Sequence, residues 1–158
     1  MKEIVILETG TLGNLKYNLL DKFGSVTYYE NTKRSETKER IKNANIIITN
    51  KVVLDEEVLK DAKNVELICE AATGYNNIDI EYAKKRNIAV TNVAGYSTQT
   101  VAQHTFALLL HLYDEISYFD NYVKSMDYSR SGNFTNITRP YNDIDGKVWG
   151  IVGLGAIG

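Results

Sequence analysis

The last six residues have a spacing that is typical of phosphate binding. A G-x-G-x-x-G pattern over 153–158 follows the apolar run 147–152. The pattern consists of Gly153, Gly155, Ala156, Ile157 and Gly158, with Leu154 after the first glycine. The first glycine permits a tight turn, the second lets the backbone approach a pyrophosphate, and the third lets a following helix pack closely. Backbone N–H groups would then face the anion, so the pattern predicts a dinucleotide-binding loop.

A glycine-rich tail is the alternative, because glycine-rich turns are common in proteins. The helix that should follow and the acidic ribose ligand expected about 20 positions further on are not in the sequence. We therefore expect the chain to be the front half of a larger enzyme, with a truncated second domain.

Titratable side chains elsewhere form no catalytic or metal-binding constellation in the sequence. His104 and His111 lie in a predicted helix, where a lone histidine is more often packed or capping than an acid–base group. Cys69 lies in an apolar run and is predicted to be an inert buried thiol. The pairs 8–9 and 50–51 end predicted strands, and we interpret them as loop residues rather than ligands. The sequence thus predicts no catalytic residue and no metal site.

Short apolar runs alternate with amphipathic stretches through the first 91 residues. We expect strands at 4–7, 26–29, 44–49, 65–71 and 88–91. We expect helices at 12–23, 35–41, 55–59 and 79–86. Gly24 is predicted to end the first helix in a left-handed conformation, and Thr32 or Ser35 to cap the second. The alternation predicts a doubly wound, flavodoxin-like parallel α/β sheet of five strands, and strands that are apolar throughout indicate cover on both faces.

The pattern changes after Asn92. The stretch 101–113 is apolar on nearly every side, which predicts a linking helix enclosed by protein. The residues 100–103 match a capping box, although Ser97 or Thr98 is an alternative cap.

The stretch 117–140 is polar, aromatic and irregular. Its aromatic side chains favour a subunit contact, with a surface excursion over its own domain as the alternative. The run 147–152 predicts the first strand of a second sheet, and we expect its unpaired edges to cause self-association or disorder.

Composition excludes several classes of protein. The chain has 158 residues, of which 44% are hydrophobic, so intrinsic disorder is excluded. A formal net charge of −2 argues against a nucleic-acid partner, and no apolar run reaches the roughly 18 residues of a membrane span. The single cysteine, Cys69, excludes a disulfide scaffold and indicates a cytoplasmic location, and we expect no signal peptide.

Three segments together resemble the D-isomer-specific 2-hydroxyacid dehydrogenases. They are ATGYNNID at 72–79, TNVAGYST at 91–98 leading into VAQHTFALL at 101–109, and 145–158. By this resemblance, residues 1–96 form a substrate-side domain. Residues 97–158 comprise the linking helix, a dimerisation arm and the start of an NAD-binding Rossmann domain. The resemblance also implies a homodimer formed through 97–145.

The resemblance implies roles for individual residues. The implied substrate ligands are Thr73, Gly74 and Tyr75, whose backbone N–H groups face the substrate carboxylate. The implied cofactor ligands are Ser97, Thr98 and Val101 at the nicotinamide end, and the glycine-pattern residues named above at the pyrophosphate. From the residues alone, the favoured interpretation of 73–75 is a strand-to-helix turn in which Asn77 or Asp79 caps the next helix. For 97–101 the alternative is helix capping and core packing, which is compatible with the cofactor role.

A member of this family interconverts a 2-keto acid and a D-2-hydroxy acid with NAD, and the residues present do not exclude NADP. The family uses an Arg to bind the keto acid and a His with an acidic partner to move the proton. None of the three matches a position within 1–158, so we expect the chain alone to be inactive and to bind NAD negligibly. Gln103 replaces the family's usual glutamate, with no expected catalytic consequence. The alternative function is a non-catalytic binding or dimerisation module of flavodoxin-like fold.

Overall fold

The computed structural model describes residues 1–140 and 143–158. Contacts divide the described chain into two compact units, Met1–Tyr96 and Ser97–Gly158. The expected dimerisation arm, 97–145, includes two residues that lie outside the described ones.

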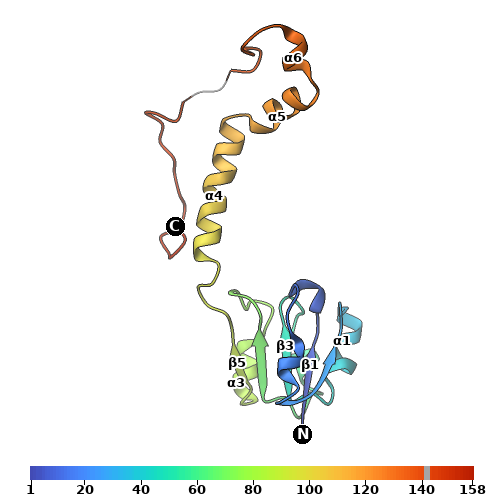
Figure 1. The fold of residues 1–158 in the computed structure, drawn as a ribbon. Coiled ribbons are helices and arrows are strands. Elements are labelled where there is room, and N and C mark those ends of the chain that lie inside the picture. The colour runs from blue at the N-terminus through green and yellow to red at the C-terminus, as the bar shows by residue number, and fades with distance from the viewer. Residues whose placement is uncertain (141–142) are drawn as a thin grey trace. The chain divides into compact units, whose positions relative to one another are not determined.

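The first unit is built on five parallel strands in the order β2-β1-β3-β4-β5 (Figure 1). They are β1 (Lys2–Ile6), β2 (Gly24–Tyr28), β3 (Ile46–Thr49), β4 (Leu67–Glu70) and β5 (Ala89–Thr91). This order and the parallel direction confirm the predicted flavodoxin-like α/β class. The strand order reverses between β1 and β3, so the carboxyl ends of these two strands flank the point where such sheets bind ligands.

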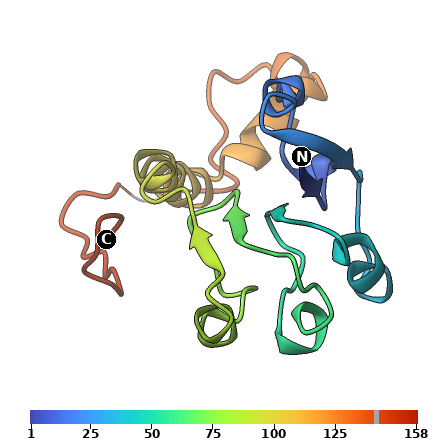
Figure 2. The ribbon, with the colours of Figure 1, turned by 90° about the horizontal axis from the view of Figure 1, so that it is seen from below.

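Three helices line one side of the sheet (Figure 2). They are α1 (Arg34–Ile41), α2 (Glu56–Leu59) and α3 (Ile80–Lys85). Ile41, Leu59 and Ala83 from these helices join Ile47 and Ile68 of the sheet in one buried cluster. The core of the first unit therefore lies on this side.

The connection from β1 to β2 lies on the opposite side of the sheet and is not the α-helix predicted at 12–23. It contains two short 3-10 helices, η1 (Thr9–Thr11) and η2 (Tyr17–Leu20). Gly13 has φ +65°, which interrupts any helix there, and Leu15 and Phe23 are exposed rather than packed on a core. The helical spacing of apolar residues was misleading, because Gly13 breaks the helix and side chains such as Leu15 and Phe23 do not pack on the sheet.

The same side of the sheet is only partly covered. Ile46 and Ile48 of β3 and Leu67 and Cys69 of β4 are half-buried, whereas their sequence neighbours on the core side are buried. The predictions of a fully covered sheet and of a buried Cys69 are therefore wrong for these four side chains.

Gly24 is the first residue of β2, not a left-handed helix end. A Cβ atom there would lie 2.1 Å from the Lys2 carbonyl oxygen, so only glycine lets β2 approach β1 at this point. The helix caps follow local chemistry. Asp55 and Asp79 accept from the backbone N–H of Val58 and Tyr82, and Lys33 rather than Thr32 or Ser35 precedes α1.

The second unit contains three helices followed by an irregular segment. They are α4 (Thr98–Tyr113), α5 (Ile116–Lys124) and α6 (Asp127–Ser131). Ser97 is the N-cap residue of α4, so the 100–103 box does not begin the helix. No residue of α4 is buried, so the predicted enclosure of this helix is wrong in the described chain.

Two further predictions for this unit are wrong. The stretch 117–140 is partly helical, because α5 and α6 are only 9 and 5 residues long and such short helices leave little periodicity to detect. Glu115 and Met126, both with positive φ, separate the three helices. The run 147–152 forms no strand, since within the described residues no neighbouring segment pairs with it.

Candidate functional site

The carboxyl ends of the parallel strands carry a pocket of about 350 Å³. Its walls include Thr11 and Leu12 after β1, Asn50 after β3, Ala71 after β4 and Val93 after β5. The pocket therefore spans the strand-order reversal, which is where open α/β sheets bind their ligands. Its lining is mostly apolar, with few polar groups, as in a small-molecule site.

The loop 71–77, which follows β4, carries the predicted substrate ligands at this edge. Its first half is held by neighbours on both sides. The N–H of Ala71 donates to the Thr49 carbonyl (2.7 Å) after β3. On the β5 side, the N–H of Val93 donates to the Ala72 carbonyl (3.0 Å), and the Asn92 side-chain amide donates to the Thr73 carbonyl (2.8 Å).

The amides at the tip of this loop are open. Among the described residues, the N–H groups of Gly74 and Tyr75 donate to no protein acceptor. A Cβ atom at Gly74 would meet nothing within 4 Å, so the glycine is not required by a close approach of the protein itself. Two neighbouring N–H groups in an exposed loop, both without a protein acceptor, can donate to one carboxylate.

Glu8 is buried at the same edge, with 4% of its surface exposed. Its Oε1 accepts from the N–H groups of Asn50 (3.0 Å), Lys51 and Val52 (3.0 Å), and its Oε2 accepts from the Thr49 hydroxyl (3.2 Å). The carboxylate thus fixes the loop after β3, one wall of the pocket. Glu8 lies in a loop, as the sequence predicted, and its burial as an anchor of the neighbouring loop was not predicted.

Glu70, at the end of β4, was not singled out by the sequence. It is 1% exposed, its Oε2 accepts from the Asn77 side-chain amide (2.9 Å), and its Oε1 has no partner among the described residues. Burial raises the pKa of the Glu70 carboxyl, and the nearby Glu8 raises it further, while Asn77 and Lys51 oppose the shift.

The predicted cofactor residues lie in the second unit. Ser97 and Thr98 begin α4, and the Ser97 carbonyl accepts from the N–H of Val101 (2.8 Å), which is 41% exposed. The segment 147–158 runs beside the middle of α4, where the Trp149 ring meets the Phe106 ring edge-on at 4.9 Å (Figure 1).

The glycine pattern folds back on itself. Gly153 has φ +133°, and a Cβ atom at Gly158 would lie 2.6 Å from the Gly153 carbonyl oxygen, so both positions require glycine. The N–H groups of 153–158 donate to no acceptor in the part of the chain that the structure describes. A Cβ atom at Gly155 would meet nothing within 4 Å.

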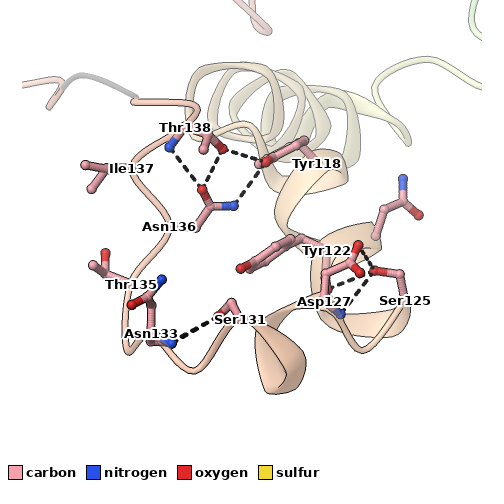
Figure 3. A pocket seen from close by; sticks show the side chains of 11 residues that line it. Tyr118, Tyr122, Ser125, Asp127, Ser131, Asn133, Thr135, Asn136, Ile137 and Thr138 are labelled. Carbon is pink, nitrogen blue, oxygen red and sulfur yellow. Dashed lines mark hydrogen bonds between the residues drawn. The ribbon is translucent and has the colours of Figure 1, made fainter.

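A second pocket, of about 660 Å³, lies in the arm formed by α5, α6 and the residues after them (Figure 3). The Tyr118 hydroxyl accepts from the Asn136 side-chain amide (3.0 Å) and lies 2.9 Å from the Thr138 hydroxyl. These two hydrogen bonds lower the pKa of the Tyr118 phenol. The Arg139 guanidinium lies 5.2 Å from the centre of the same ring. The pocket joins aromatic surface to polar groups, the composition of protein interfaces.

Two searches of the described residues gave negative results. In residues 1–140 and 143–158, no group of three or more His, Cys, Asp or Glu side chains is placed to hold a metal ion. None of the helices described there has the length and apolar character needed to cross a bilayer.

Comparison with known proteins identifies the family. Residues 4–143 match the family described as D-isomer specific 2-hydroxyacid dehydrogenase, catalytic domain. The chain belongs to this family. A putative 2-hydroxyacid dehydrogenase of Haemophilus influenzae is 36% identical over 132 residues, which is 84% of this chain and 42% of the relative. A hydroxypyruvate reductase of Blautia hydrogenotrophica is 32% identical over 161 residues, which is 99% of this chain and 50% of the relative.

A solved structure extends the similarity to the fold. D-lactate dehydrogenase from Aquifex aeolicus, complexed with NAD and lactic acid, has a TM-score of 0.69 and 28% identity over 85% of this chain and 39% of its own. The chain spans about half the length, or less, of the curated relatives it matches.

Proposed function

We propose that this family member supplies the substrate-side domain and the beginning of the cofactor domain of an NAD-dependent enzyme that interconverts 2-keto acids and D-2-hydroxy acids. The observation that carries the proposal is the open pair of amides at Gly74 and Tyr75, at the ligand-binding edge of the sheet. In this proposal Met1–Tyr96 is the substrate-side domain, and Ser97–Gly158 contains the linking helix and the dimerisation arm.

The turn 73–75 binds the substrate carboxylate through its backbone. Hydrogen bonds from N–H groups to a carboxylate are charge-assisted and hold the anion in one orientation. The bound carboxylate fixes the position of the adjacent keto or hydroxyl carbon, which lowers the entropy cost of the reaction. The mostly apolar pocket at the same edge of the sheet, which Ala71 of the loop 71–77 lines, holds the rest of a small substrate.

The second unit holds the cofactor through two sets of residues. Gly153, Gly155, Ala156, Ile157 and Gly158 bind its pyrophosphate, and their unpaired N–H groups and the open space at Gly155 suit that anion. Ser97, Thr98 and Val101 line its nicotinamide end. The nicotinamide supplies the hydride when bound, and NADP remains a second candidate because the ribose ligand is not among these residues.

The chain by itself is proposed to be inactive. Two helical histidines, His104 and His111, are present, and neither matches the family's proton donor. We expect no oxidation of NADH above an enzyme-free blank with pyruvate, hydroxypyruvate or glyoxylate, and measurable turnover would contradict this.

The arm 97–145 is proposed to pair with a second copy. Phe134 and Ile137 are 91% and 81% exposed, and large exposed apolar side chains favour an interaction surface. A cytoplasmic location fits an enzyme of this kind whose single cysteine, Cys69, is a free thiol.

A titration of the isotope-labelled chain with glyoxylate, followed by NMR, tests the carboxylate site. The amide resonances of Gly74 and Tyr75 should shift and saturate, whereas methyl pyruvate, which lacks the negative charge, should leave them in place. Gly74→Ala puts a methyl group in the open space before the amides and should weaken glyoxylate binding by about tenfold or more. Gly150→Ala is the matched control, because a Cβ atom there also meets nothing within 4 Å. A glyoxylate response confined to other residues would favour the non-catalytic alternative.

A further inference from the structure

The loop 71–77, which carries the carboxylate-binding turn, is closed at its base by a single pair of side chains. Glu70 comes immediately before the loop and Asn77 is its last residue, and the Asn77 amide donates to Glu70 Oε2 at 2.9 Å. The same Asn77 amide donates to the Val52 carbonyl (3.2 Å), in the loop after β3. The Asn77 carbonyl accepts from the N–H of Leu54 (2.8 Å), so one residue ties the turn to both neighbouring segments.

The two glutamates at this edge of the sheet have opposite surroundings. Glu8 receives four hydrogen bonds, three from backbone N–H groups and one from a threonine hydroxyl. Glu70 receives one, and its Oε1 is buried without a partner in the described chain. A buried carboxylate is stable when several donors surround it, and an isolated one favours its neutral form. Both oxygens of Glu8 thus have donors, whereas the surroundings of Glu70 favour its protonated form.

We propose that Glu70 is a positioning residue for the turn 73–75, that it holds the turn through Asn77 in its protonated form, and that its ionisation releases the turn. The role of the turn in binding substrate rests on the proposed function. The pH-dependent contact between Glu70 and Asn77, called the clamp below, does not depend on it. On ionisation, Glu70 would carry a buried charge with an unpaired oxygen close to the charge of Glu8. Movement of the side chain toward water or toward Lys51 relieves this. Asn77 then loses its hydrogen bond to Glu70 and keeps only those to the segment after β3, at Val52 and Leu54.

The charged groups that act on Glu70 are few. Glu8 after β1 disfavours its ionisation, and Lys51 after β3 favours it. Lys51 makes no ion pair with Glu70 within 4.0 Å in the described structure. It therefore favours the charged form of Glu70 from a distance and does not supply the hydrogen bond that Asn77 donates. Burial supports the same direction by raising the pKa of the Glu70 carboxyl.

The test follows the amide resonances of Gly74 and Tyr75 in the 158-residue chain as the pH is raised from acid to neutral, without ligand. They should shift with the same midpoint as the Glu70 side-chain carboxyl resonance. Glu70→Gln, which keeps the shape and an acceptor for Asn77 but cannot ionise, should remove this shift. Glu66→Gln is the matched control, because Glu66 adjoins the other end of β4 and is exposed in an ion pair with Lys2. The control should titrate like the wild type.

Glyoxylate binding gives the functional readout. Wild-type affinity should fall with rising pH, by at most about tenfold per pH unit for one released proton, and Glu70→Gln affinity should stay flat. A turn whose resonances ignore the ionisation of Glu70, or a Glu70→Gln chain with the wild-type pH profile, would overturn the clamp. Glyoxylate that binds at no pH, while the turn still follows Glu70, would overturn the proposed function instead. If Glu70→Gln does not fold, the two midpoints in the wild-type chain still decide the matter.

Discussion

Glu8 and Glu70 show how much one residue's surroundings decide its role. They lie at the same edge of one sheet, and both are buried. Glu8 anchors the loop after β3 through three consecutive N–H groups, and Glu70 meets a single amide donor. Removing the first should therefore cost stability, and neutralising the second should add to it.

Glu8→Ala should lower the free energy of unfolding by roughly 3 kcal/mol, because it leaves buried N–H groups without an acceptor. Denaturant unfolding followed by circular dichroism measures this. Glu3→Ala is the control, because Glu3 is exposed on β1 and uses only its backbone to bond Asn45. A loss of the same small size in both variants would show that Glu8 is not an anchor.

Glu70→Gln should stabilise the chain at neutral pH by roughly 1 kcal/mol, because it removes a poorly solvated charge. The pKa of Glu70 is raised in the folded chain, so the folded state binds the proton more tightly than the unfolded state. Stability contributed by Glu70 is therefore present at acid pH and lost as the pH rises through the folded pKa. The gain in stability from Glu70→Gln should therefore vanish at acid pH. Melting temperatures of both chains across the pH range measure this gain. A gain of equal size at every pH would contradict the prediction.

These roles were not predictable from neighbouring residues. Asp79 was one of two residues expected to cap the helix after the turn 73–75, and it does so, because a cap depends on an N–H three positions along the chain. The partners of Glu8 are more than 40 positions away, and only the pairing of β1 with β3 brings them together. Glu70 was missed because its partner, Asn77, was considered only as a turn or cap residue.

At the scale of elements, strands and their order followed from sequence more reliably than connections did. Buried β-branched runs at β1, β3 and β4 have few alternatives in a small α/β sheet. The apolar spacing of 12–23 is also compatible with an irregular segment, because an amphipathic helix is stable only when its apolar face packs against other residues. The same physics explains the missing strand at 147–152, which requires a neighbour to pair with.

Helix α3 connects the loop 71–77 to the core, and its start depends on one carboxylate. Asp79→Ala removes the acceptor for the Tyr82 N–H (2.9 Å) and should cost about 1 kcal/mol of unfolding free energy. Glu81→Ala, in the same first turn, loses only its interaction with the helix dipole and should cost a few tenths. Thermal unfolding of both variants decides this, and equal losses would show that the cap does not stabilise α3.

At the scale of the whole molecule, the two units have different degrees of burial. The first has a buried core, whereas the helices of the second contain no buried residue. A family assignment over 4–143 indicates that both belong to one enzyme architecture. The fold class of the first unit was predictable, but the exposure of the second was not, because a hydrophobic helix has the same sequence pattern whether its partner belongs to its own chain or to another.

Phe134→Ser should weaken self-association of the chain by about tenfold or more, since a central aromatic side chain often dominates an interface. Sedimentation over a range of concentrations measures the dimer dissociation constant. Leu19→Ser, which removes an exposed apolar side chain of the first unit, is the control and should leave the constant unchanged. A wild-type chain that stays monomeric throughout would refute the dimerisation arm.

The most direct test of the carboxylate site is a crystal structure of the chain grown with oxalate, a small anion shaped like a 2-keto acid. We predict that one carboxylate lies within about 3.2 Å of the N–H groups of Gly74 and Tyr75, in the loop that follows β4. Oxalate bound only elsewhere, with the turn 73–75 unoccupied at saturating concentration, would contradict the substrate-side role of Met1–Tyr96.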